Sequence, residues 1–341
     1  YSIYFAFFTS LIVTYFAIPK VILFAEKYRL SDVPGERASH EKSVPIFGGV
    51  AIFSGILLSL LFWGTFGDIQ VILISLLLVF FVGIIDDLLS LSPLKKLLGL
   101  ILPVLVIIYF GDIQIDSMHG VLGVKELPDL LATLFTIFVV IVITNSFNLI
   151  DGVDGLAAGI GFIASFSFGF LSFLMQQVDM AIIAFSLSGA LLAFLKYNFN
   201  PARIFMGDTG SLLVGMILSI LAINLIGTGL VIDKMHMPNK GPLLAIVFLA
   251  IPLFDSLRVF IVRISDGRHP LYPGRGHIHH ALLDLGVGHK KTAVILYLVS
   301  CLLILGSYFL LEFNINIGII LVTIVSYTML IIPFYLRRKK Q

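Results

Sequence analysis

The chain has 341 residues, of which 59% are hydrophobic and only 12% are charged. Soluble domains carry about 25% charged residues, so this composition excludes a soluble globular protein and indicates a polytopic membrane protein. A formal net charge of +2 is too small to argue for nucleic acid as a partner. Cys301 is the single cysteine, so an internal disulfide is excluded.

Eleven apolar segments are long enough to cross about 30 Å of hydrocarbon as helices. In chain order they are residues 2–24, 46–64, 69–85, 93–110, 130–148, 156–175, 179–196, 210–232, 242–264, 291–310 and 316–335. The first is too long for a signal peptide and lacks a cleavage site, so we expect it to be retained. The fourth is the weakest because its apolar core is short. The predicted fold is an all-α integral membrane bundle of about 11 helices, forming one domain over residues 1–341.

The basic residues between these segments predict the orientation of the bundle. Nineteen Lys and Arg residues fall on one side of the membrane, whereas the other side holds only Lys125, Lys234 and Lys240. The positive-inside rule therefore puts the N-terminus outside and the C-terminus in the cytoplasm. It also puts the polar motifs described below in the five cytoplasmic loops. Five aspartates in mid-membrane would cost about 12–17 kcal/mol, so a proton or ion relay through the bilayer is disfavoured.

The stretch ITNSFNLIDGVDGLAAG, residues 143–159, spaces Asn145, Asn148, Asp151 and Asp154 by three. Glycines within it make one continuous helix improbable. We expect a helix that ends near Leu149, then a tight acidic turn, then a new helix from about residue 155. Two plainer alternatives stay open: Asp154 only caps the second helix, and Asn145 only forms a hydrogen bond between helices.

The adjacent acids Asp86 and Asp87 diverge by about 100° if they lie on a helix, so they cannot both face one ligand. We expect one of them to act and the other to orient it, unless they only form a solvated helix end. Lys96 follows in the same loop region, and a positive-inside anchor is an equal alternative for it. Asp208 lies between Gly207 and Thr209 directly before an apolar segment, where the chain can approach a bulky ligand closely or simply enter a helix.

The last cytoplasmic loop, GRHPLYPGRGHIHH, collects His277, His279 and His280 with Arg268 and Arg275. A transition-metal site, an anion-binding loop and a solvated basic loop all fit this composition. The histidines lack the spacing of a helical zinc pair and no cysteine is nearby, which argues against zinc. Arginine and imidazole together suit phosphate.

Hard oxygen ligands with few nitrogens favour Mg²⁺, with Mn²⁺ as a substitute. Proteins usually hold Mg²⁺ with one or two carboxylates together with substrate phosphates. The inner face therefore predicts a phosphate or diphosphate substrate. Because this face lies at a membrane surface between helices, we expect one partner to be a lipid.

Taken together, these motifs resemble the polyprenyl-phosphate N-acetylhexosamine-1-phosphate transferases, an integral membrane family of glycosyltransferases. The resemblance runs from Asp32 to His289 and is closest to the bacterial undecaprenyl-phosphate GlcNAc-1-phosphate transferases. Five segments carry it in order: D-x-P-x-x-R-x-x-H with Asp32, Pro34, Arg37 and His40; DD with Asp86, Asp87 and Lys96 beyond; N-x-F-N-x-x-D-G-x-D-G from Asn145; F-M-G-D-T-G-S from Phe205; and H-I-H-H from His277.

The resemblance implies transfer of GlcNAc-1-phosphate from UDP-GlcNAc to undecaprenyl phosphate, which releases UMP. This would be the first membrane step of O-antigen, teichoic acid or related glycan synthesis, in a multi-pass protein of the bacterial inner (plasma) membrane. A homodimer is compatible with the family. Gly274 and Gly276 depart from the usual acidic and polar residues before the first histidine. Because both changes fall in the sugar-reading loop, another UDP-N-acetyl sugar such as UDP-MurNAc-pentapeptide stays open.

The resemblance also implies residue roles. Asp208 and Asn148 would hold Mg²⁺, Asp86 would abstract or repel the proton of the lipid phosphate, and Lys96 would neutralise phosphate charge. The remaining candidates would orient groups or bind substrate: catalytic Asp87, Asp151, Asp154 and His279, and substrate-binding Asn145, Phe205, Arg275, His277, His280, Asp32, Arg37 and His40.

Two functions of other classes are alternatives to a transferase. A transporter or channel needs polar residues along helix interiors or two related halves, and the sequence has neither. A membrane metal hydrolase acting on lipid diphosphates would use the same acids with water as the nucleophile.

Overall fold

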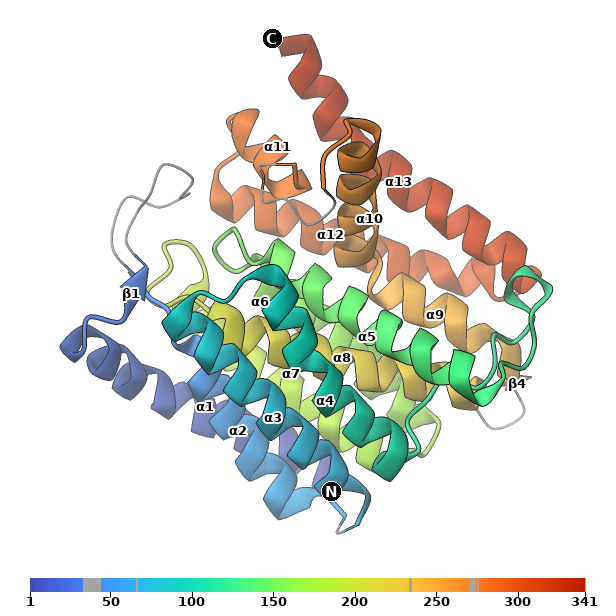
Figure 1. The fold of residues 1–341 in the computed structure, drawn as a ribbon, viewed down its shortest axis with the longest axis horizontal. Coiled ribbons are helices and arrows are strands. Elements are labelled where there is room, and N and C mark those ends of the chain that lie inside the picture. The colour runs from blue at the N-terminus through green and yellow to red at the C-terminus, as the bar shows by residue number, and fades with distance from the viewer. Residues whose placement is uncertain (33–43, 66, 233–234, 270–273, 275, 341) are drawn as a thin grey trace.

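The computed structural model describes residues 1–32, 44–65, 67–232, 235–269, 274 and 276–340 (Figure 1). The described part is helical apart from two short two-stranded sheets, β1 (Ser31–Asp32) with β2 (Val44–Pro45) and β3 (Leu230–Ile232) with β4 (Met235–Met237). The α-helices are α1 (Ser2–Lys27), α2 (Gly48–Trp63), α3 (Asp68–Leu89), α4 (Pro93–Gly111), α5 (Asp129–Ile150), α6 (Leu156–Leu174), α7 (Val178–Asn198), α8 (Gly207–Thr228), α9 (Gly241–Phe248), α10 (Ala250–Ser265), α11 (Ile278–Asp284), α12 (His289–Leu310) and α13 (Ile315–Lys340). Two 3₁₀ turns, η1 (Val121–Gly123) and η2 (Pro238–Lys240), complete the elements.

The helices confirm a polytopic membrane bundle, but the number of spans differs from the predicted eleven. Within the described ranges, nine helices are long and apolar enough to cross a membrane, or ten if α9 and α10 form one bent span. The short segment is α2, with 16 residues, and not the fourth, because α4 is a full 19-residue helix. The two sides of the membrane are not distinguished by the structure, so the orientation stays a prediction.

The ninth predicted segment, residues 242–264, is wrong as a single helix. The chain bends by 80° between α9 and α10. Pro252 explains the break, because it has no N–H to offer the carbonyl of Phe248 and its ring crowds that carbonyl. The bend turns α10 away from α9 and brings it against α13, which also contacts α11 (Figure 1).

The core of the bundle is α8, which is apolar on nearly all sides and packs against α2, α3, α5 and α9. Backbones approach its N-terminal end so closely that they leave no room for side chains. A Cβ on Gly49 would strike the backbone of Gly210, and a Cβ on Gly83 would strike the backbone of Thr209. This tight packing holds the start of α8 against the start of α2 and the C-terminal part of α3.

The expected break in the acidic stretch is confirmed. Helix α5 ends at Ile150 and α6 begins at Leu156. Gly155 has a φ of +76°, a conformation that side chains rarely tolerate, and its N–H donates to Asn198 Oδ1 at 3.0 Å. The turn between the helices therefore faces the same end of the bundle as the start of α8.

Candidate active site

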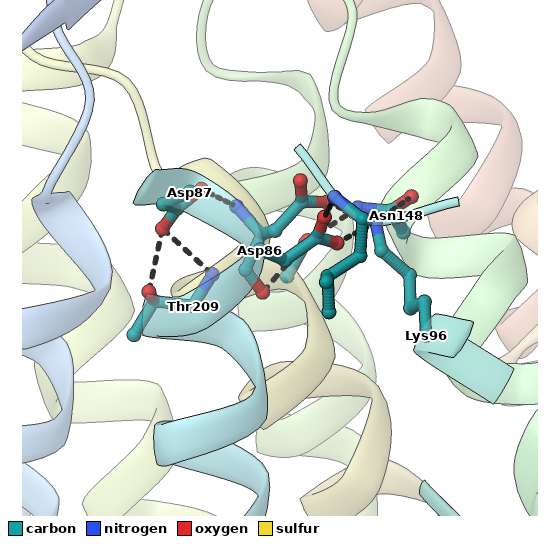
Figure 2. A network of polar contacts seen from close by, with 8 residues as sticks. Asp86, Asp87, Lys96, Asn148 and Thr209 are labelled. Carbon is teal, nitrogen blue, oxygen red and sulfur yellow. Dashed lines mark hydrogen bonds and ion pairs between the residues drawn. The ribbon is translucent and has the colours of Figure 1, made fainter. Parts of the chain in front are cut away.

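Three oxygen atoms from three helices converge on one positive charge at this end of the bundle (Figure 2). The ammonium of Lys96, in the first turn of α4, lies 2.5 Å from Asp86 Oδ2 and 2.6 Å from Asp208 Oδ1. Asn148 Oδ1 is 3.4 Å from the same nitrogen, and its amide group also donates to Asp208 and, at 2.9 Å, to Ser211 Oγ. We call Asp86, Lys96, Asn148 and Asp208 the cation cluster.

Asp86 is the most deeply buried member of the cation cluster, with 4% of its surface exposed. Its other oxygen, Oδ1, accepts the N–H of Leu91 at 2.8 Å just beyond the end of α3. Both oxygens of this carboxylate therefore have partners, as a buried charge requires. Removing one partner of such a pair typically costs about 3–5 kcal/mol, because a buried charge is left uncompensated.

Asp87 points the other way, as helical geometry predicts (Figure 2). It accepts the N–H groups of Asp208 and Thr209, at 2.6 and 3.0 Å, and the hydroxyl of Thr209 at 2.5 Å. Negative charge is favourable at the N-terminus of a helix, where N–H groups are otherwise unpaired. Asp87 thus fixes the start of α8, and with it the position of the neighbouring Asp208.

Asp154 connects three segments and does not cap α6. It accepts hydrogen bonds from Asn200 Nδ2 at 2.8 Å and Ala202 N at 3.1 Å, and it lies 3.6 Å from His289 Nδ1 at the start of α12. Burial alone would raise the pKa of Asp154, but the interactions with His289, Asn200 and Ala202 outweigh it and lower the pKa. The carboxylate therefore stays ionised and ties the acidic turn to its surroundings.

Asp151 is the acid in the turn whose pKa is shifted furthest. Burial, followed by repulsion from Asp208, Asp87 and Asp154, raises its pKa to about 7. It lines a cavity of about 340 Å³ that opens beside the cation cluster. Six further predicted site residues line the same cavity: Lys96, Asn145, Asn148, His277, His279 and His280.

His277, directly before α11, and His279 and His280 within α11 line the same cavity. His277 and His279 stack with their ring centroids 5.6 Å apart, and the ring centroids of His279 and His280 are 4.3 Å apart. Burial, together with the charge of His280, lowers the pKa of His279 to about 3, so this ring is neutral near neutral pH. His279 also packs against Gly152 so closely that a Cβ there would lie 2.8 Å from Nε2.

Asp255 is a site residue that the sequence prediction missed. It is fully buried in α10, and its carboxylate binds His277 Nδ1 at 2.8 Å and accepts the N–H of Ile278 at 2.9 Å. Arg258, one turn later, donates to the carbonyl of Gly276 and stacks 3.7 Å from the ring of Phe334. A carboxylate and a guanidinium inside an apolar segment were the available signal, because a buried charge needs a partner.

Several predicted site residues lie outside this constellation. Phe205 is held by backbone hydrogen bonds to Pro45 and Gly48, at 2.8 and 3.0 Å, and it does not line the 340 Å³ cavity. Asp32 belongs to β1, where it pairs with Val44. Three further predicted residues, Arg37, His40 and Arg275, lie outside the residues that the structure describes.

The cation cluster fits a hard divalent cation by its chemistry. Three oxygens, two from carboxylates and one from an amide, already converge on one positive charge. Among the described residues, no three His, Cys, Asp or Glu side chains form a group that could hold a metal by themselves. A donor set of this size is typical of Mg²⁺ sites that are completed by substrate phosphates.

Comparison with known proteins identifies the family. Residues 69–226 match the model of glycosyl transferase family 4. A Bacillus subtilis protein named probable undecaprenyl-phosphate N-acetylglucosaminyl 1-phosphate transferase is 31% identical over 96% of this chain and 90% of its own length. The chain belongs to glycosyl transferase family 4. A relative from Pasteurella multocida, named undecaprenyl-phosphate alpha-N-acetylglucosaminyl 1-phosphate transferase, is 33% identical over 88% of the chain and 86% of its own length.

A third relative is named for a different polyprenyl phosphate, decaprenyl phosphate. The Mycolicibacterium smegmatis decaprenyl-phosphate N-acetylglucosaminephosphotransferase is 30% identical over 88% of this chain and 80% of its own length. The segment that matches the family 4 model contains the whole cation cluster and the acidic turn. The histidines of α11 lie beyond it. The resemblance inferred from the motifs is therefore confirmed: the protein is a multi-pass membrane transferase of family 4.

Proposed function

We propose that the protein transfers GlcNAc-1-phosphate from UDP-GlcNAc to undecaprenyl phosphate, giving undecaprenyl-diphosphate-GlcNAc and UMP. The observation that carries this proposal is the convergence of Asp86, Asn148 and Asp208 on one positive charge beside the 340 Å³ cavity. The names of the three relatives support N-acetylglucosamine and a polyprenyl phosphate, and two of them support undecaprenyl in particular.

The reaction makes one P–O bond and breaks another. An oxygen of the lipid phosphate attacks the sugar-bearing phosphorus of UDP-GlcNAc, and the bond from that phosphorus to UMP breaks. All reacting groups are anionic, so the site must supply positive charge and hold two phosphates in line. Asp208 and Asn148 would hold Mg²⁺ or Mn²⁺, which neutralises the diphosphate when bound.

Lys96 is the protein's own positive charge in this reaction. Its flexible side chain lets the ammonium move from the two carboxylates to a phosphate oxygen. Such a move would release Asp86, whose Oδ2 pairs with Lys96 at 2.5 Å, to accept the proton of the incoming lipid phosphate. Asp87 holds the start of α8 in place throughout.

The other cavity residues would bind the sugar and the diphosphate. Asn145 of α5, Asp151 of the acidic turn and the histidines at the start of α11 all line this cavity. A neutral His279 can exchange hydrogen bonds with sugar hydroxyls without adding charge. We place the reaction at the cytoplasmic face of a bacterial plasma membrane, as a first step in making a cell-surface glycan.

The test is lipid-dependent release of UMP by the purified protein given UDP-GlcNAc, undecaprenyl phosphate and Mg²⁺. We expect release to stop without the lipid or after chelation of the metal. Release without the lipid would instead identify a hydrolase, and a panel of UDP-sugars would reveal a different donor. We expect Asp208→Asn to lower turnover by at least about 10²-fold, whereas the control Asp129→Asn, at the start of α5 on the opposite end, leaves it unchanged.

A further inference from the structure

A second cavity, of about 630 Å³, lies between α10 and the C-terminal end of α13. It is separate from the active-site cavity but shares Arg263 and Gly274 with its lining. Most of the polar residues that line it are arginines. The five arginines around it are Arg258, Arg263, Arg268, Arg337 and Arg338, and we call this space the arginine cavity.

Positive charge exceeds negative charge in the arginine cavity. Asp266, the one acid in its described lining, lies 3.8 Å from Arg268, and Asp284 of α11 pairs with Arg337 at 3.1 Å. Even with the buried Asp255 counted beside Arg258, five arginines face three acids. This excess favours an anion as the occupant.

The burial of Arg258 indicates that this cluster of arginines does more than anchor one side of the bundle. Anchoring arginines reach water separately, whereas Arg258 is only 7% exposed and lies against the cavity. Its terminal nitrogen donates to the carbonyl of Gly276, but its Nε–H has no acceptor among the described residues. A buried guanidinium needs compensating negative charge, and the nearby carboxylate of Asp255, 3.7 Å away, already binds His277 and Ile278, so Arg258 adds to the preference of the cavity for an anion.

The arginine cavity also has an apolar wall, which distinguishes a lipid from a free anion. Val259 and Val262 of α10 face Ile331 and Phe334 of α13 across the same space. A soluble phosphate would leave this wall unused. An amphiphile would place its anionic group among the arginines and its hydrocarbon along the wall.

We propose that the arginine cavity binds an anionic membrane phospholipid through its phosphate group. The bound phosphate would accept hydrogen bonds from the arginines of α10 and α13 and so bridge these helices. Because Arg258 also holds the carbonyl of Gly276, directly before His277, the lipid would stabilise the approach to α11. This inference does not rest on the proposed reaction, because it concerns binding and stability alone.

The experiment measures the thermal unfolding midpoint, Tm, of the full chain in vesicles of phosphatidylcholine with and without phosphatidylglycerol. The double variant Arg268→Gln/Arg338→Gln removes two cavity charges and keeps the contacts of Arg258 and Arg337. The control Arg29→Gln removes the same kind of charge from an exposed position after α1. We expect phosphatidylglycerol to raise the Tm of the wild type and of the control by about 3 °C, and to leave the double variant unchanged.

Three results would overturn the proposal. An equal rise in all three proteins would mean that the membrane charge acts diffusely and not at the cavity. No difference between the two vesicle compositions would mean that no anionic lipid binds. The same rise with inorganic phosphate in phosphatidylcholine vesicles would mean that the occupant is a free anion and not a lipid.

Discussion

The pairing of Asp255 with His277 predicts that a buried aspartate far from the acidic motifs controls the reaction. In Asp255→Asn the new amide can still accept the N–H of Ile278, which now lies 2.9 Å from Oδ1. Its NH₂ group then faces Nδ1 of His277, where the carboxylate now lies at 2.8 Å. The ring must then present Nδ1 as an acceptor and carry its proton on Nε2. Nε2, which is an acceptor when Nδ1–H donates to the carboxylate, therefore becomes a donor.

The size of the effect follows from the bond that is lost. A hydrogen bond to a charged group contributes about 1.5–3 kcal/mol, which corresponds to about a 10- to 150-fold loss of turnover if the orientation of His277 matters in the transition state. The fold should survive with a lower Tm, because the substitution preserves size and one of the two hydrogen bonds but removes the negative charge 3.7 Å from Arg258. The assay is lipid-dependent UMP release, with Tm measured alongside.

A double-mutant cycle separates positioning from general damage. If Asp255 acts through His277, then Asp255→Asn should cost nothing further in a His277→Gln background. ¹⁵N spectra of labelled histidine should also show one ring changing tautomer in Asp255→Asn, assigned by its absence in His277→Gln. Additive losses, or an unchanged tautomer, would refute the role of Asp255 as a positioning residue for His277.

Three other substitutions test the packing and charge of the site. Lys96→Met should lower the stability by about 3–5 kcal/mol, seen as a lower Tm, because it leaves a buried carboxylate unpaired; a Tm equal to that of the wild type would contradict the ion pairs. Gly83→Ala should lose most turnover and about 1–3 kcal/mol of stability, because the added Cβ strikes the backbone of Thr209, whereas Gly227→Ala, where a Cβ meets open space, should be neutral in both assays. The pKa of Asp154 is lowered in the folded state, so its stabilisation is complete above the unfolded pKa and is lost as pH falls through the folded value. Asp154→Asn should therefore lower the Tm at pH 7, with a difference from the wild type that shrinks below about pH 4; a constant difference would argue against this linkage.

The sequence predicted the parts of the site that depend on local chain geometry. The break between Asn148 and Asp154 follows from glycines that a helix does not favour, and the divergence of Asp86 from Asp87 follows from the helical repeat. Their convergence with Asp208 followed from the alternation of helices across the membrane, which returns every second loop to the same side. No detail of tertiary packing was needed for these inferences.

Features that depend on contacts between distant segments could not be predicted in the same way. Asp255 was an evident buried charge, but nothing local identifies His277 as its partner 22 residues away, beyond the end of α10. The bend itself had a signal in Pro252, which is weak because prolines also occur in straight stretches such as Pro103 of α4. Phe205 was grouped with the site by its motif, whereas its backbone is held by β2 and the start of α2.

The bend between α9 and α10 has a consequence for how the proposed lipid acceptor would reach charged residues. Helix α9 has eight residues and so rises only about 12 Å, less than half of a hydrocarbon layer of about 30 Å. Beyond this point α10 continues at 80° to α9. If the acceptor is a polyprenyl phosphate, as proposed above, its chain could stay in the hydrocarbon beside α10 while its phosphate approaches Asp255 and the histidines.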